Sequence, residues 1–123
     1  QGWSQLPQTG ENLIITKSLK DVMALYEVTG IPSVSLQCEN VLPKQQIFNE
    51  LSNRFLDIYI FYDNDYDKEE NWGQLFAQKF KDSFNVFDII IEDKYECKDF
   101  SDFVKKHGII EAKKLVKSQL MLF

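Results

Sequence analysis

Histidine and cysteine are scarce in this 123-residue chain, and each scarcity excludes a class of site. His107 is the only histidine, so a zinc site built from several histidines is excluded, and a Ser-His-Asp triad would have to use this one residue. Cys38 and Cys97 are the only cysteines, and neither belongs to a Cys-x-x-Cys motif. We therefore expect two reduced thiols and a cytoplasmic protein.

Long apolar runs and an excess of basic residues are also missing. No run approaches the roughly 20 apolar residues of a membrane span, and no secretory signal opens the sequence, so no membrane partner is expected. The net charge of -5 argues against a stand-alone module that holds nucleic acid electrostatically. A catalytic part that binds metal ions beside a basic neighbouring domain remains compatible with this charge. Because the chain begins at Gln1 and not at methionine, we expect a segment of a larger protein.

The residues that are abundant indicate one ordered globular domain. Hydrophobic residues make up 44% of the chain, and ten of them are phenylalanine. Residues 1–11 are polar and contain proline and glycine, which predicts a lead-in or linker before an α/β domain over 12–123. Short apolar runs at 13–15, 33–36, 58–62 and 86–91 predict strands.

Helical periodicity separates these runs. Helices are predicted between Ser18 and Gly30, from Pro43 through Phe55, from Trp72 to Phe80, and over 100–106 and 109–120. Strands that alternate with helices imply right-handed crossovers. We therefore predict a compact α/β sandwich with a mostly parallel, Rossmann-like sheet of about four strands flanked by helices. The stripe formed by Trp72, Phe76 and Phe80 is expected to be core, not a stacking platform.

Each predicted strand is followed by polar residues, and most of them are acidic. They are Thr16, Lys17, Ser18 and Asp21; Gln37, Cys38, Glu39 and Asn40; Asp63, Asn64, Asp65 and Asp67; and Glu92 and Asp93, before a loop with Asp99 and Asp102. In an open parallel sheet, ligands bind in the crevice at the carboxyl ends of the strands. Packing of the core does not require carboxylates at that edge, so their presence there indicates a functional site.

Asp63 and Asp65, separated by one residue at a strand end, can both turn toward one point. Two ionised carboxylates a few ångströms apart repel each other unless a cation neutralises them. Oxygen ligands without cysteine or histidine favour Mg²⁺ or Mn²⁺ over zinc. The competing interpretation is an Asn/Asp turn whose acids favour the dipole of the following helix. Lys17 contacts a phosphate, neutralises a nearby acid, or is a solvated lysine in the first helical turn.

The order of these motifs resembles the Toprim domain, and among Toprim proteins it is most similar to the bacterial and phage type of DNA primase. The resemblance covers about residues 11–108. It includes the stretch 16–21 (TKSLKD), the Asp63-Asn64-Asp65 motif, and the stretch 98–108 (KDFSDFVKKHG), which resembles the third acidic motif of the family.

The resemblance implies metal-dependent nucleotidyl transfer during primer synthesis in DNA replication. Asp63 and Asp65 would be catalytic, and Asp99 and Asp102 would complete the Mg²⁺ or Mn²⁺ site. Lys17 would contact nucleotide phosphate and Asp21 would orient the first loop. The implied partners are nucleotides and a single-stranded DNA template held by neighbouring domains, with a helicase or other replication proteins, in a bacterial or phage-infected cell.

One position departs from the family pattern. Lys17 and Ser18 stand where the family has a glutamate and a glycine. Either Glu39 supplies the missing carboxylate from the next strand end, or the domain is a degenerate, non-catalytic module of a replication complex. A Toprim-type nuclease would share the same acids. A phosphoacceptor receiver domain is disfavoured, because it needs an acidic pair after the first strand and a lysine after a fifth strand.

Overall fold

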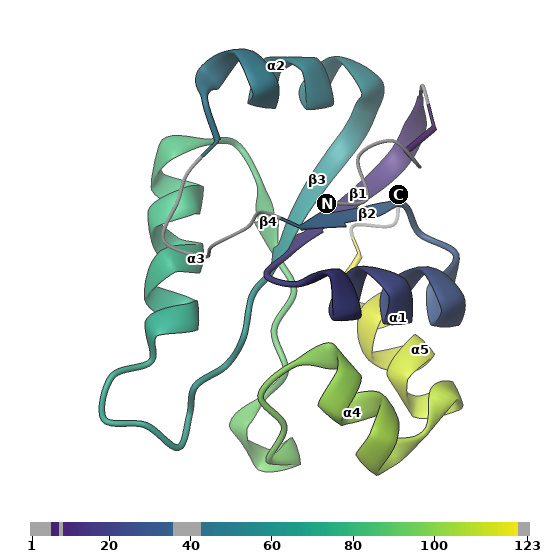
Figure 1. Cartoon of the computed structure of the whole chain (residues 1–123), viewed down its shortest axis with the longest axis vertical. Helices are drawn as coiled ribbons and strands as arrows, with labels where there is room; N and C mark the ends of the chain where they lie inside the picture. The colour runs from purple at the N-terminus through teal and green to yellow at the C-terminus, as the bar shows by residue number, and fades with distance from the viewer. Residues whose placement is uncertain (1–5, 8, 36–42, 121–123) are drawn as a thin grey trace.

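The computed structural model describes residues 6–7, 9–35 and 43–120. A four-stranded sheet, parallel throughout, lies between two layers of helices (Figure 1). Its strands are β1 (Gly10–Thr16), β2 (Ser33–Ser35), β3 (Phe55–Phe61) and β4 (Phe87–Asp88), in the order β2-β1-β3-β4. The predicted fold class is confirmed.

Five α-helices and one short 3-10 turn are described. They are α1 (Leu19–Thr29), α2 (Gln45–Arg54), α3 (Trp72–Ser83), α4 (Phe100–His107), α5 (Ile109–Gln119) and the turn η2 (Asp93–Tyr95). In Figure 1, α1, α4 and α5 lie on one side of the sheet and α2 and α3 on the other. No helix in the described ranges is long and apolar enough to cross a membrane.

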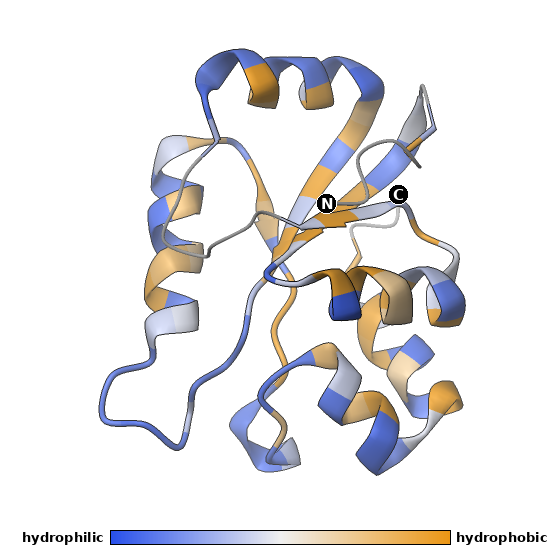
Figure 2. Ribbon diagram, viewed as in Figure 1, coloured by the Kyte–Doolittle hydropathy of each residue, from blue (hydrophilic) through white to orange (hydrophobic). Residues whose placement is uncertain are grey.

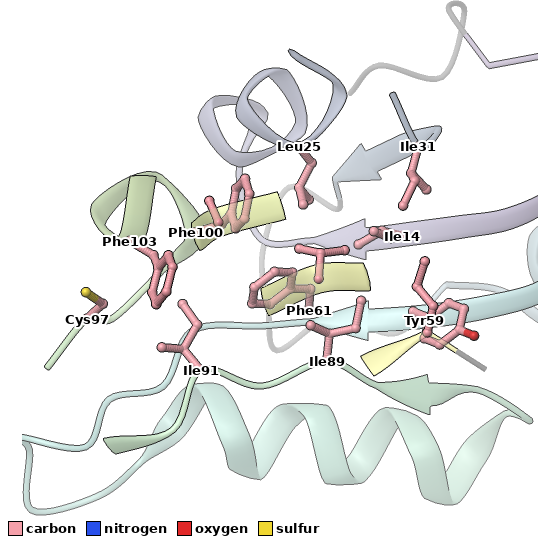
Figure 3. Packing of buried hydrophobic residues seen from close by; sticks show 13 residues of the cluster. Ile14, Leu25, Ile31, Tyr59, Phe61, Ile89, Ile91, Cys97, Phe100 and Phe103 are labelled. Atoms are coloured by element: carbon pink, nitrogen blue, oxygen red, sulfur yellow. The ribbon is translucent and has the colours of Figure 1, made fainter. Parts of the chain in front are cut away.

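Each face of the sheet carries its own hydrophobic core, because successive strand residues point to opposite faces. Ile14, Tyr59 and Phe61 pack with the side chains of α1, α4 and α5 (Figure 3). Leu13 and Ile15 pack on the other face with residues of α2 and α3. Figure 2 shows the result: hydrophobic strands at the centre, and a hydrophilic loop between β3 and α3.

The strand order places a crevice between β1 and β3. The helix that follows β1 covers one face and the helix that follows β3 covers the other, so the two connections leave the sheet in opposite directions. Such a switch point leaves open space beyond the carboxyl ends of the two central strands. The residues that follow β1 and β3 are therefore the first to inspect for a site.

Helix α1 begins and ends as the sequence predicts. Ser18 caps its first turn, and Gly30 ends it with a left-handed backbone (φ 73°), which glycine adopts without strain. The residues Leu19, Val22, Met23 and Tyr26 have the i, i+3, i+4, i+7 spacing of a buried helix face, but only Val22 of the four is buried. Leu25 is buried instead, and Tyr26 is 65% exposed.

Helix α3 corrects the predicted core stripe. Phe80 is fully buried and Phe76 half-buried, but Trp72 is 55% exposed. The stripe that faces the sheet is Gly73, Ala77 and Phe80. The reason is steric: a Cβ at Gly73 would overlap the carbonyl oxygen of Asp63, so only glycine lets the helix approach β3 here. That contact fixes the rotation of the helix and leaves Trp72 outside the core.

Three boundaries also differ from the prediction. Strand β1 begins at Gly10, inside the expected lead-in, and Phe55 opens β3 instead of ending α2. The predicted strand 86–91 is regular only at Phe87–Asp88. Beyond it, the side-chain amide of Gln119 takes the place of a neighbouring strand, because it accepts from the N–H of Ile90 (2.9 Å) and donates to its carbonyl (2.8 Å).

Candidate metal centre

The turn after β1 positions Asp21. The hydroxyl of Thr16 donates to the carbonyl of Ser18 (3.1 Å), and the Ser18 hydroxyl accepts from the backbone N–H of Asp21 (3.3 Å). One oxygen of Asp21, Oδ1, accepts from the N–H (3.2 Å) and the hydroxyl (2.7 Å) of Ser101, in the first turn of α4. Asp21 is thus only 3% exposed and is held from two helices.

The segment after β3 is fixed through the side chain of Asn64. Its amide donates to the carbonyl of Ile91 and to Asp93, both at 2.7 Å, and accepts from Asn71 (2.6 Å). Its backbone N–H donates to the carbonyl of Lys98 (2.8 Å). A buried polar side chain whose bonding groups are all used holds its backbone firmly. Asn64 therefore fixes the acids on either side of it.

Asp63 and Asp65 leave this segment in different environments. Both are buried. Oδ2 of Asp65 accepts from the backbone N–H of Gly73 (3.1 Å), at the start of α3. Its Oδ1 accepts no hydrogen bond within the described part of the chain and has an ion-pair contact with Nζ of Lys98 at 3.4 Å. Asp63 instead faces the first loop, where its Oδ2 lies 3.1 Å from Nζ of Lys17.

Asp99 enters from the loop before α4. It caps that helix, because its Oδ1 accepts from the N–H of Asp102 (2.9 Å). Its Oδ2 lies 3.5 Å from Nζ of Lys20. The Asp99 carboxylate thus lies at the N-terminal end of α4, close to Asp21 and Asp63.

Three carboxylates converge at this point. Asp21, Asp63 and Asp99 each offer one oxygen, and these oxygens all lie within 4.8 Å of one another. We call these three residues the acidic cluster. Asp65 and Asp102, which the sequence interpretation included, are not part of a cluster of this kind within the described ranges, and Asp21, expected only to orient the loop, is. Glu39 lies outside the described residues.

Three lysines surround the acidic cluster. Lys17 and Lys20 contact Asp63 and Asp99, and Nζ of Lys98 lies 3.8 Å from Asp63 in addition to its contact with Asp65. The side chains of Lys17 and Lys98 are 41% and 36% exposed. The three ammonium groups balance much of the negative charge of the site, and those of Lys17 and Lys98 retain access to solvent.

The buried position of Asp21 affects its ionisation. Burial, and then the charge of Asp99, raise the pKa of Asp21 above its usual value, although the two bonds from Ser101 oppose the shift. The pKa of Lys20 is raised as well, chiefly by the charge of Asp99. A carboxylate held in this way gains stability when a cation approaches it.

Most of the chain superposes on a solved structure described as a small TOPRIM domain protein from Bacillus stearothermophilus. The TM-score is 0.61 with 19% sequence identity, and the match covers 92% of this chain and 90% of that one. The chain has a Toprim fold. No protein-family model matches it, and neither does any curated protein.

On this Toprim fold, the acidic cluster occupies the switch point between β1 and β3. Sequence reasoning located Asp63 and Asp99 there but missed the residues that support them: Asn71, Gly73, Lys98 and Ser101. One signal was present in the sequence. Lys98 directly precedes Asp99, so its ammonium group could be expected close to the acids. The contacts of Gly73 and Ser101 depend on helix packing, which spacing along the chain does not show.

Proposed function

We propose that this Toprim domain takes part in metal-dependent phosphoryl transfer on nucleotide or nucleic-acid phosphates. Asp21, Asp63 and Asp99 would hold the divalent cation. The observation that carries the proposal is the convergence of these three carboxylates within 4.8 Å at the switch point of a parallel sheet. Three like charges this close, two of them on buried residues, favour a divalent partner.

The residues present fit such a cation. Every donor is a carboxylate oxygen, and neither His107 nor Cys97 belongs to the cluster, which favours Mg²⁺ or Mn²⁺ over zinc. Oδ1 of Asp65 is buried with only the Lys98 ion contact within the described residues, so the site holds a further oxygen with unused accepting capacity. Burial and the charge of Asp99 raise the pKa of Asp21, so a divalent cation at the cluster would favour its ionised form.

The metal would supply charge neutralisation at the phosphate and polarise the reacting oxygens. The residues of the chain would bind the metal and the phosphate and orient them. Lys17 and Lys98 contact carboxylates here, but their exposure allows them to turn toward a phosphate that enters the crevice. Asn64 and Ser101 keep the acids in place while the lysines move.

Within this chemistry, the resemblance to primases favours nucleotidyl transfer. A primer 3′-hydroxyl oxygen would attack the α-phosphorus of a nucleotide, and pyrophosphate would leave. Template would be held by basic neighbouring domains, since this chain has a net charge of -5. Glu39 is our candidate for the proton acceptor, because Lys17 stands where the family has its glutamate. Asp65 and Asp102 would support the site from outside the acidic cluster.

A specific observation favours a second candidate, a non-catalytic Toprim module. Lys17 lies 3.1 Å from Asp63 and Lys98 contacts both Asp63 and Asp65, so the site can be neutral without a metal. In that case the fold would serve to organise a complex. A nuclease would use the same acids but would hydrolyse the phosphodiester.

The test compares three activities side by side in Mg²⁺ and in Mn²⁺. A primase-like domain is expected to incorporate nucleotides on a primed template. A nuclease is expected to cleave single-stranded DNA, and a non-catalytic module is expected to do neither. Asp63→Asn is the matched variant, since it keeps the shape of the side chain and removes its charge. Incorporation that disappears in Asp63→Asn supports the proposal. Incorporation that the variant retains, or no activity at all, contradicts it.

A further inference from the structure

An exposed aromatic pair opens helix α3. The ring of Trp72 stacks on that of Phe76, with centroids 5.9 Å apart and an angle of 25° between the planes. Trp72 is 55% exposed although it is one of the largest side chains in the chain. An exposed aromatic ring that is stacked on a neighbour offers a flat surface on which a nucleic-acid base can stack.

The pair is held in place by the residues that build the metal centre. The next residue after Trp72 is Gly73, whose N–H bonds Asp65 and whose Cα packs on the backbone of Asp63. The residue before it, Asn71, caps α3 and accepts from the N–H of Asp65 (2.8 Å). Both chain neighbours of Trp72 therefore contact the Asp63–Asp65 segment, and the position of Trp72 follows that of these acids.

A cation lies on the same side of the helix. Trp72, Phe76 and Lys79 are spaced i, i+4 and i+7, which places them along one face of α3, and Lys79 is exposed. An aromatic surface and a flexible ammonium group next to a phosphate site form the combination that binds single-stranded nucleic acid. A surface for a protein partner would not need that proximity to a phosphate site.

We propose that Trp72 stacks on an unpaired base of a single-stranded nucleic acid whose phosphate enters the metal centre. The inference rests on the proposed function and adds to it a residue that contacts a base and a preference for unpaired strands. The flat face of a base is available in a single strand, but in a duplex its neighbours cover it. Trp72 therefore selects single-stranded over double-stranded substrate.

The experiment measures the affinity of the chain for a labelled oligothymidine of about 12 nucleotides, within the site sizes of single-strand binders, and for the matching duplex, in Mg²⁺. Trp72→Ala is expected to weaken single-strand binding about 5- to 150-fold, the range for the loss of one base–aromatic stack. Duplex binding should change much less. Trp72→Phe retains a ring and should restore most of the affinity.

Two further variants make the outcome specific. Tyr26→Ala removes an aromatic residue that is even more exposed (65%, against 55% for Trp72) but lies toward the far end of α1, and it should leave affinity unchanged. Asp63→Asn tests the metal centre by itself. If Trp72→Ala binds like the wild type while Asp63→Asn does not, the stacking is wrong and the metal function stands. If Asp63→Asn binds normally in Mg²⁺ and Trp72→Ala does not, the metal function fails and the stacking remains.

The aromatic pair could instead be a contact for another protein. Sedimentation of the same variants decides this alternative. If Trp72→Ala alters self-association but leaves oligothymidine affinity intact, the pair is a protein contact and the inference is overturned. Far-UV circular dichroism should be unchanged in Trp72→Ala, because the residue is not part of the stripe that packs on the sheet.

Discussion

Replacing Asp21 by asparagine should stabilise the metal-free protein at neutral pH. Asp21 is 3% exposed and its pKa is raised, first by burial and then by the charge of Asp99. The carbonyl oxygen of asparagine can keep both hydrogen bonds from Ser101 (2.7 and 3.2 Å). Its amide group can donate where the second carboxylate oxygen of Asp21 now accepts from Ser18. The substitution thus removes a buried charge while the hydrogen-bonded frame remains.

The expected gain follows from the distance between the two charges. The oxygens of Asp21 and Asp99 in the acidic cluster lie within 4.8 Å. Two unit charges at that distance repel by about 1–3.5 kcal/mol for effective dielectric constants of about 80 down to 20. Lys20, 3.5 Å from Asp99, offsets part of this repulsion. We expect the free energy of unfolding to rise by about 1 kcal/mol at pH 7, or about 4 °C in Tm for a domain of this size.

The gain should depend on pH, with a defined sign. Because the folded-state pKa of Asp21 lies above its ordinary value of 3.8, the folded protein binds this proton more tightly than the unfolded chain does. The contribution of Asp21 to stability is therefore fully present below pH 3.8 and is lost as the pH rises through the folded-state pKa. Asparagine does not titrate. The advantage of the variant should be small in acid and complete at neutral pH.

Thermal unfolding with a chelator present, at several pH values, measures this difference. Asp102→Asn is the matched control, since Asp102 lies outside the acidic cluster, in the first turn of α4. Losing its negative charge near the helix N-terminus should cost about 0.3–1 kcal/mol, a change of opposite sign. If Asp21→Asn lowers Tm at pH 7, or raises it equally in acid and at neutral pH, the charge of Asp21 is already compensated and the reasoning is refuted.

Three further predictions concern the surroundings of the site. Lys17→Met removes a cation that competes with Mg²⁺ for Asp63. A unit charge roughly 6 Å from a divalent ion opposes its binding by about 1.4 kcal/mol even in water. The Mg²⁺ affinity measured by calorimetry should therefore rise about tenfold, and an unchanged affinity would contradict the competition. Gly73→Ala should lower the free energy of unfolding in urea by about 3 kcal/mol, because the new Cβ overlaps the Asp63 carbonyl, and a loss below about 1 kcal/mol would show that α3 shifts freely. Gln119→Ala should speed hydrogen exchange at the Ile90 amide and destabilise by about 2 kcal/mol; an amide that stays protected would mean that Gln119 does not close this edge.

The fold and the position of the site were predictable because they depend on local patterns. Continuous apolar runs and helical spacing identified a parallel sheet, and a parallel sheet places its strand ends at one edge. Asp63 and Asp99 could therefore be located from the sequence. Ser18 and Gly30 bounded α1 correctly, since capping and a left-handed turn are properties of the residues themselves.

The membership of the acidic cluster was not predictable, because helix packing decides it. Asp21 and Asp102 both lie in the first turn of a helix, and spacing alone treats them alike. Docking of α4 on α1 brings Ser101 against Asp21 and buries it, whereas Asp102 remains half-exposed. Asp65, only two residues from Asp63, is drawn away by the N–H of Gly73.

The exposure of Trp72 was missed for a similar reason. Apolar spacing in α3 allowed two stripes, and bulk suggested the aromatic one. The close approach of Gly73 to Asp63 selected the other, because the helix can come near β3 only where it has no side chain. The residue that decides the orientation is thus the smallest in the helix.

Binding of Mn²⁺ to the chain tests the central claim most directly. Titration followed by electron paramagnetic resonance counts free Mn²⁺ and requires no substrate or partner. The account predicts one site that Asp63→Asn weakens strongly and Asp102→Asn leaves almost unchanged, because Asp63 belongs to the acidic cluster and Asp102 does not. Equal binding by the wild type and by Asp63→Asn would contradict it, because the ion would then bind elsewhere. No binding by either would also contradict it and would mean that the lysines neutralise the site without a metal.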